Sequence, residues 1–264
     1  MKTQRPFGHQ LREWRQRRHL SQLELATEVE ISARHLSFVE TGRSQPSRGM
    51  VLKLAENLDV PLRERNALLI AAGYAPMYGA LSLSDPAMSA ARAALELILA
   101  GHEPYPAMLV DRHWNLVSAN KAAQRFLAGI APELLQPPVN VLRGTLHPRG
   151  FSTRIENLSQ WRSHVLARVA RDLELTADPT LAELLVELRG YPGGEESVDA
   201  DPPGVVVPML VRSEAGTLSM FSTTTVFGTA VEVTLSELVL EAFYPADEFT
   251  KTVLAQVAAG ALAR

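Results

Sequence analysis

Histidines and one serine are the side chains of this sequence best suited to acid–base or nucleophilic chemistry. Four of the seven histidines lie beyond residue 100, at His102, His113, His147 and His164, without the short spacing of a metal site. The chain has no cysteine that could complete such a site. Ser163 and His164 are neighbours on a predicted helix, where adjacent side chains point apart, so they have the wrong geometry for a nucleophile and its base.

Motifs of known enzyme classes are also absent from the sequence. It contains no G-x-S-x-G, no G-x-G-x-x-G, no Walker-type G-x-x-x-x-G-K and no H-E-x-x-H. We therefore expect no catalytic residue, no metal and no cofactor.

A second group of side chains suits recognition rather than catalysis. Hydroxyl, amide and guanidinium groups recur between Gln22 and Arg48, and they can hydrogen-bond phosphate oxygens or the edges of bases. Arg34 is the best candidate for base recognition, since a guanidinium group can donate two hydrogen bonds to one guanine. Ala33 and Phe38 could contact thymine methyl groups. The full candidate set is Gln22, Ser32, Ala33, Arg34, Phe38, Arg43, Ser44, Ser47 and Arg48.

Two short helices joined by a tight turn are predicted to position this set. Ser21 and Glu24 form an S-x-x-E capping box at the start of the first helix. Ser32 is a second N-cap candidate, and Gly42 stands just past the end of the second helix. Helices this short must pack across the turn, and the second helix of such a helix-turn-helix can enter the major groove of DNA. The apolar residues expected to face the core are Leu25, Ala26 and Val29 in the first helix and Leu36 and Val39 in the second.

Several positions agree in register with one known family: Gln22, Leu25 and Ala26 (Q-x-x-L-A), Ser32, Leu36, Glu40, Gly42, Arg43 and Pro46. Residues 11–74 thus resemble the Xre/lambda-repressor-like regulators of bacteria. The resemblance implies a five-helix DNA-binding domain and an ion pair between Arg15 and Glu40. Glu30 stands where the family commonly has glycine, so a left-handed turn there would be strained. One helix reads few base pairs, so we expect a homodimer on a palindromic operator. We also expect the protein to act as a repressor.

Strand signals appear only beyond residue 100. Residues 107–111 and 114–119 read as two strands, and several helices follow. Residues 205–212, 216–226 and 230–241 read as three more strands, and 247–262 as a final helix. Two strands, then helices, then three strands is the order of a PAS-like α+β domain with an antiparallel five-stranded sheet. We therefore expect a multidomain protein, with an all-α domain over residues 1–79 and the PAS-like domain over 80–264.

The stretch VDRHWNLVSANKAA, residues 110–123, resembles the MmyB-like regulators, with Trp114 and Asn120 in the expected places. That resemblance implies a domain that senses a ligand, such as a fatty acid or a similar apolar molecule. Flexible or aromatic residues of the predicted sheet and central helix suit such a ligand, and polar residues of the middle segment could bind its carboxylate or carbonyl group. The candidate ligand-binding residues are Met108, Val110, His147, Arg154, Asn157, Trp161, Met209, Met220 and Phe221.

Charge and hydropathy agree with this division of the chain. Residues 1–79 carry twelve basic and eight acidic side chains, a net charge of about +4, whereas residues 80–264 carry fourteen and twenty-one, about −7. The excess of positive charge suits a DNA partner for the first domain only. No leader or membrane-spanning segment is evident, so we expect a cytoplasmic protein without a membrane partner. Two alternatives stay open: a DNA-tethered enzyme acting on a small carbonyl or ester substrate, and a regulator whose second domain only dimerises.

Overall fold

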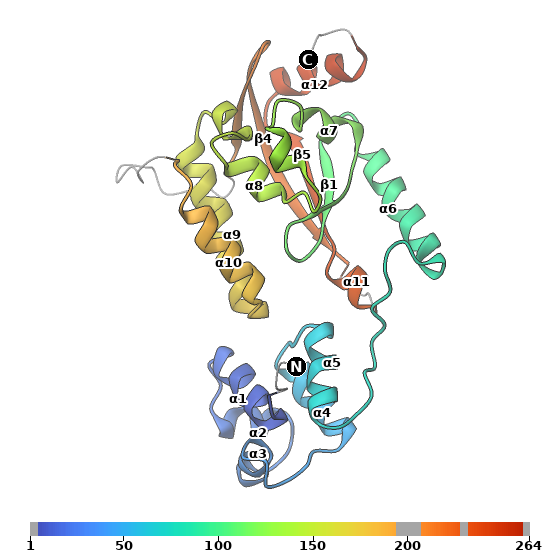
Figure 1. Ribbon diagram of the computed structural model, residues 1–264, viewed down its shortest axis with the longest axis vertical. Helices are drawn as coiled ribbons and strands as arrows, with labels where there is room; N and C mark the ends of the chain where they lie inside the picture. The colour runs from blue at the N-terminus through green and yellow to red at the C-terminus, as the bar shows by residue number, and fades with distance from the viewer. Residues whose placement is uncertain (1–4, 194–206, 228–231, 261–264) are drawn as a thin grey trace. The chain divides into compact units, whose positions relative to one another are not determined.

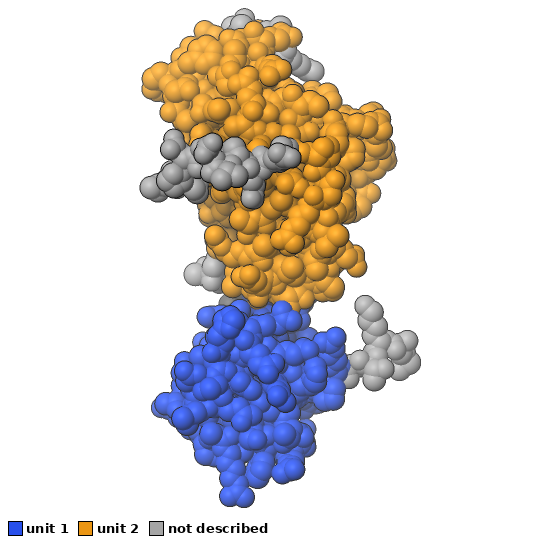
Figure 2. All heavy atoms as spheres, turned by 90° about the vertical axis from the view of Figure 1, so that its left-hand side faces the viewer, with its two compact units in different colours: residues 1–82, 229–236 blue, residues 83–228, 237–264 orange. Residues whose placement is uncertain are grey.

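The computed structural model describes residues 5–193, 207–227 and 232–260 of the chain (Figure 1). The chain forms two compact units, which Figure 2 distinguishes by colour. The first unit consists of residues 1–82 and 229–236, and the second of residues 83–228 and 237–264. Each unit has a hydrophobic core of its own. No helix within the described ranges is long and apolar enough to cross a lipid bilayer.

Five helices enclose the core of the first unit, as the sequence predicts. The predicted capping box is present: the Glu24 amide donates to Ser21 Oγ at 3.2 Å, and the Ser21 amide donates to the Glu24 carboxylate at 2.7 Å. Ser32 caps the third helix by accepting from the His35 amide at 3.1 Å. The helices are α1 (Phe7–Arg17), α2 (Gln22–Glu28), α3 (Ala33–Glu40), α4 (Arg48–Asn57) and α5 (Leu62–Ala71).

The turn between α2 and α3 is left-handed at Glu30, whose φ is 56°. A residue with a Cβ atom is strained in this conformation, so the prediction made for this position is confirmed. The Ile31 amide closes the turn by donating to the Ala26 carbonyl at 2.9 Å. The exposed Glu30 carboxylate accepts a hydrogen bond from Lys53 Nζ at 2.7 Å, which ties the turn to α4.

A further short helix of the first unit comes from the far end of the sequence. Helix α11 (Val233–Ser236) belongs to this unit and packs against α5. The Val233 amide donates to the Gly79 carbonyl at 2.8 Å, and the Leu81 amide donates to the Glu232 carboxylate at 2.7 Å. Val233 is fully buried. The first unit is therefore built from two separate stretches of sequence.

The second unit contains an antiparallel sheet of five strands in the order β2-β1-β5-β4-β3. Strand β1 pairs with both β2 and the last strand, β5, so the chain leaves the sheet after β2, forms its helices and returns. This confirms the predicted α+β class with a five-stranded antiparallel sheet. The strands are β1 (Ala107–Val110), β2 (Leu116–Ala119), β3 (Met209–Ser213), β4 (Gly216–Val226) and β5 (Val239–Pro245).

The last strand begins later than predicted. A strand was expected over residues 230–241, but α11 occupies 233–236 and β5 starts at Val239. The physical reason is competition for backbone groups: Val233 bonds to Gly79, and the Glu232 carboxylate accepts from the Leu235 amide at 2.9 Å. These groups are then not available to a neighbouring strand. Residues 228–231, where the predicted strand would begin, lie outside the described ranges.

Helices pack against the sheet of the second unit and against one another (Figure 1). Asn120 caps α7, and its Oδ1 accepts from the amides of Ala123 at 2.9 Å and Ala107 at 3.0 Å. One side chain thus joins the start of β1 to the start of α7. The helical segments are η1 (Pro86–Met88), α6 (Ser89–Gly101), α7 (Lys121–Phe126), η2 (Pro132–Leu135), α8 (Val141–Leu146), η3 (Phe151–Arg154), α9 (Leu158–Thr176), α10 (Pro179–Arg189) and α12 (Glu248–Ala258).

Candidate DNA-contacting surface and ligand cavity

A buried ion pair holds the end of helix α3 in place. Arg15 Nε and Nη2 donate to the two carboxylate oxygens of Glu40 at 2.6 and 3.0 Å, in the bidentate geometry that guanidinium and carboxylate groups favour. Arg15 Nη1 also donates to the Leu20 carbonyl at 2.7 Å. The Arg15–Glu40 pair that the family resemblance implies is therefore present, and it joins α1 to α3.

Gln22, the first residue of α2, is bonded to the same carboxylate. Its Nε2 donates to Glu40 Oε2 at 2.7 Å, so its amide group is already oriented within the protein. The residue is half-buried. This arrangement links the start of α2 to the end of α3 through one acidic side chain.

Helix α3 presents four of the candidate DNA-contacting residues near its start and middle. Ser32 and Arg34 are exposed, whereas Ala33 and Phe38 are half-buried. The Arg34 guanidinium lies over the Phe38 ring, 5.4 Å from its centroid, which holds the long side chain along the helix surface. The Ser32 hydroxyl serves the helix cap. Arg34 and Phe38 therefore form one continuous candidate reading surface.

The loop after α3 carries the remaining candidates. The amides of Arg43 and Ser44 both donate to the Phe38 carbonyl, at 2.8 and 3.1 Å, and Ser47 caps α4 through its hydroxyl. Backbone amides of a loop can also bind phosphate, but these two are used inside the turn. The exposed side chains of Arg43 and Arg48 thus become the principal phosphate-binding candidates of the loop.

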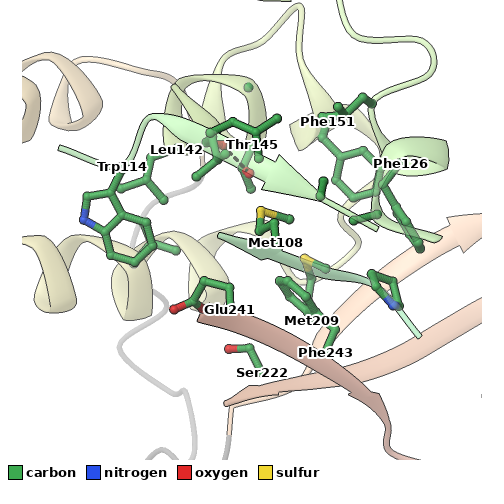
Figure 3. A pocket seen from close by; sticks show the side chains of 18 of the residues that line it. Met108, Trp114, Phe126, Leu142, Thr145, Phe151, Met209, Ser222, Glu241 and Phe243 are labelled. Carbon is green, nitrogen blue, oxygen red and sulfur yellow. Dashed lines mark hydrogen bonds between the residues drawn. The ribbon is translucent and has the colours of Figure 1, made fainter. Parts of the chain in front are cut away.

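The second unit contains a cavity of about 110 Å³ between the sheet and helices α7, α8 and α9. In Figure 3, Phe126 and Phe151 lie on one side of it, and Trp114 and Glu241 lie on the other. Most of the lining is aliphatic, aromatic or methionine. Four of the nine sequence-derived ligand candidates contribute to this lining: Met108, Trp161, Met209 and Met220.

The other five candidates lie outside the cavity lining. Val110 is buried in the core, and Phe221 stacks on the ring of Tyr244. The three polar candidates, His147, Arg154 and Asn157, have partners elsewhere. His147 packs edge-on against Tyr191, the Arg154 guanidinium lies over the Phe151 ring, and Asn157 holds the start of β3 by bonding to the Pro208 carbonyl and the Leu210 amide.

Two charged residues of the cavity were not anticipated from the sequence. Arg168 Nη2 donates to Glu241 Oε1 at 2.5 Å, and the guanidinium lies over the Trp114 ring, 4.4 Å from its centroid. Glu241 is buried and also accepts from Thr224 Oγ1 at 3.1 Å. Arg168 lies seven residues after Trp161, two turns along the same face of α9, and this spacing is a signal that the sequence contained.

Burial also affects the histidine between these two residues of α9. His164 lines the cavity and stacks on the Trp161 ring, with centroids 5.4 Å apart. Burial and, to a smaller extent, the nearby Arg168 charge lower the pKa of His164 below its ordinary value. The lowered pKa favours the neutral form of the imidazole.

Comparison with protein families assigns both parts of the chain. A model of a helix-turn-helix domain matches residues 6–68, and the model of the MmyB-like transcription regulator ligand binding domain matches residues 91–257. A search of curated proteins found no match. The second family model alone covers more than half of the chain, and it contains the cavity. The chain thus belongs to the MmyB-like transcription regulators, as a DNA-binding regulator with an N-terminal helix-turn-helix domain and a C-terminal ligand-binding domain.

Proposed function

We propose that this regulator is a repressor that binds a palindromic operator as a homodimer and senses an apolar, fatty-acid-like molecule. The observation that carries the proposal is the apolar cavity of the second unit, present in the same chain as a candidate reading surface formed by the exposed Arg34 and the half-buried Phe38. Both matched families are regulatory, and we therefore propose no catalytic activity. We also propose that it works in the cytoplasm, where its operator would lie.

Arg34→Ala is expected to lower affinity for the operator by about 1–3 kcal/mol and to relax the preference at one base position, since Arg34 is proposed to bond one guanine. Arg43→Ala should weaken binding to all sequences alike and lower the salt slope by roughly one unit, because Arg43 is proposed to bind phosphate. Affinities for an operator selected from random DNA and for unrelated DNA, measured over a range of salt concentrations, separate the two roles. Equal losses on both DNAs for Arg34→Ala would refute its reading role.

The proposed dimer predicts a fixed spacing on DNA. Two copies of α3 reach successive major grooves when half-sites lie one helical turn, ~34–36 Å, apart or a multiple of it. Adding about five base pairs between half-sites should abolish tight binding, and adding about ten should restore it. Sedimentation of the full chain should give a dimer. A monomer that binds tightly at every spacing would contradict this assembly.

The cavity supports a ligand whose bulk is apolar. Its volume of about 110 Å³ is somewhat below that of an engineered cavity of about 150 Å³ that binds benzene. A long acyl chain therefore requires rearrangement of the lining, for which Met108, Met209 and Met220 are well suited because methionine side chains are flexible.

Protein stripped of lipid should melt at a higher temperature when medium- or long-chain acyl compounds are added, because a ligand that binds only the folded state stabilises it. Its operator affinity should change in parallel if the ligand prefers one state of the regulator. Mass spectrometry of small molecules that co-purify with the native protein identifies the class independently. Failure of every acyl compound to stabilise the protein, with none co-purified, would leave the second domain as a packed dimerisation module.

A further inference from the structure

The indole N–H of Trp161, a residue that lines the ligand cavity, is a buried hydrogen-bond donor without a partner among the described residues. Trp161 lines the cavity and is only 5% exposed. Its Nε1 has no hydrogen-bond partner among the described residues. A buried donor without a partner loses the hydrogen bonds it would make in water, and such groups are rare in folded proteins. An acceptor atom of a bound molecule would supply the missing partner.

Among the described residues, the cavity lining offers no free cation for an ionised ligand. Of the lining residues that the structure describes, Arg168 and Glu241 are the only acidic or basic ones apart from His164, and they are paired with each other at 2.5 Å. Burial lowers the pKa of His164, which favours its neutral form. A carboxylate that entered this cavity would lose its hydration without gaining a counter-ion, and burial of an unpaired charge is strongly unfavourable.

Transfer of Arg168 from Glu241 to a ligand carboxylate does not remove this cost. Glu241 is 5% exposed and would keep only the hydroxyl of Thr224 among the partners it has in the structure. One buried carboxylate would then replace another as the unpaired charge, and breaking a buried pair is costly. The existing Arg168–Glu241 pair thus disfavours an anionic head group, whereas an uncharged one leaves the pair intact.

We propose that the ligand has an uncharged head group whose carbonyl or hydroxyl oxygen accepts a hydrogen bond from Trp161 Nε1. The ligand class is then an acyl-chain amide, ester or alcohol rather than an ionised fatty acid. This inference rests on the proposed function, in which the cavity binds an apolar sensor ligand, and it specifies the chemistry of the ligand's polar end.

A series of ten-carbon compounds with one chain and different head groups tests the inference. Decanamide, methyl decanoate, decanol and decanoate are titrated calorimetrically into the lipid-free full-length protein at pH 7, below their aggregation limits. The amide, ester and alcohol should bind at least about tenfold more tightly than decanoate. Decanoate binding as tightly as decanamide would overturn the inference and leave the proposed function standing. Absence of binding by all four would refute the proposed apolar sensor site and the inference together.

Two variants examine the two halves of the inference separately. Trp161→Phe keeps an aromatic ring but removes the donor, so the amide and alcohol should lose about tenfold in affinity. Trp14→Phe, in the other unit, serves as the matched control and should leave the affinity for each of the four compounds unchanged. Glu241→Gln releases Arg168 as a cation, so decanoate should gain about tenfold. Unchanged head-group preference in Trp161→Phe would overturn the assigned donor, and this result does not depend on whether Glu241→Gln folds.

Discussion

Glu40→Gln is expected to lower the free energy of unfolding of the DNA-binding unit by about 3–5 kcal/mol. Glu40 accepts from Arg15 and from Gln22, and the side chains of Arg15 and Glu40 are only 9% and 2% exposed. Removal of the carboxylate charge leaves the buried guanidinium without its counter-ion. The bond to Gln22 is weakened at the same time, so the start of α2 loses its link to the end of α3.

Glu30→Gln provides the matched control within the same unit. Glu30 also forms an ion pair, with Lys53 at 2.7 Å, but its side chain is 82% exposed. Exposed pairs contribute little, so the melting temperature of this variant should stay within error of the wild type. Thermal melts of both full-length variants, followed by circular dichroism, make the comparison. Equally small shifts in melting temperature for the two variants would show that the Arg15–Glu40 pair contributes no more to stability than a surface contact.

Gly8→Ala is the second substitution expected to have a large effect. A Cβ atom at Gly8 would lie 2.3 Å from the Glu40 carbonyl oxygen and 2.6 Å from that of Val39, far inside van der Waals contact. These are backbone atoms at the end of α3, so no side-chain rotation can relieve the clash. The loss of stability should reach the upper part of the range of about 1–3 kcal/mol found for overpacked cores. Because α3 is displaced, operator affinity should fall as well.

Gly49→Ala is the control for this effect. Gly49 lies in α4, and an added Cβ atom there meets no atom of the described residues within 4 Å. Alanine is the better helix former, so this variant should be more stable by about 0.5–1 kcal/mol. Chemical denaturation measures both variants. A Gly8→Ala protein that is as stable as Gly49→Ala and binds operator normally would mean that α1 can move away from α3 at little cost.

The helix-turn-helix could be predicted from the sequence because its signals are local. The capping serines Ser21 and Ser32 lie beside the helices they begin, and the apolar stripes repeat within a few residues. The partner of Arg15 came from the family resemblance, since no local pattern identifies Glu40 as its counter-ion. The sequence indicates which side chains form the reading surface, but the contact between Arg34 and Phe38 depends on their rotamers.

The ligand cavity was harder to predict because its parts are distant in sequence. Four of its apolar lining residues, Met108, Trp161, Met209 and Met220, followed from strand and helix patterns, whereas the Arg168–Glu241 pair joins residues 73 positions apart. The polar candidates His147, Arg154 and Asn157 were chosen by position in the middle segment. In the fold all three lie outside the cavity lining, and the Arg154 guanidinium lies over the ring of Phe151, which lines the cavity. The types of side chain in one segment do not determine which of them face the sheet, because most strands of that sheet come later in the chain.

Helix α11 makes the DNA-binding unit discontinuous in sequence, and this limits how such regulators can exchange their parts. The unit includes residues 229–236 as well as residues 1–82, and the buried Val233 belongs to the later stretch. Recombination at a single point near residue 82 would therefore join a new DNA-binding head to a foreign α11. A successful exchange of heads, by evolution or by engineering, should carry both stretches or keep a matching surface around Gly79 and Leu81.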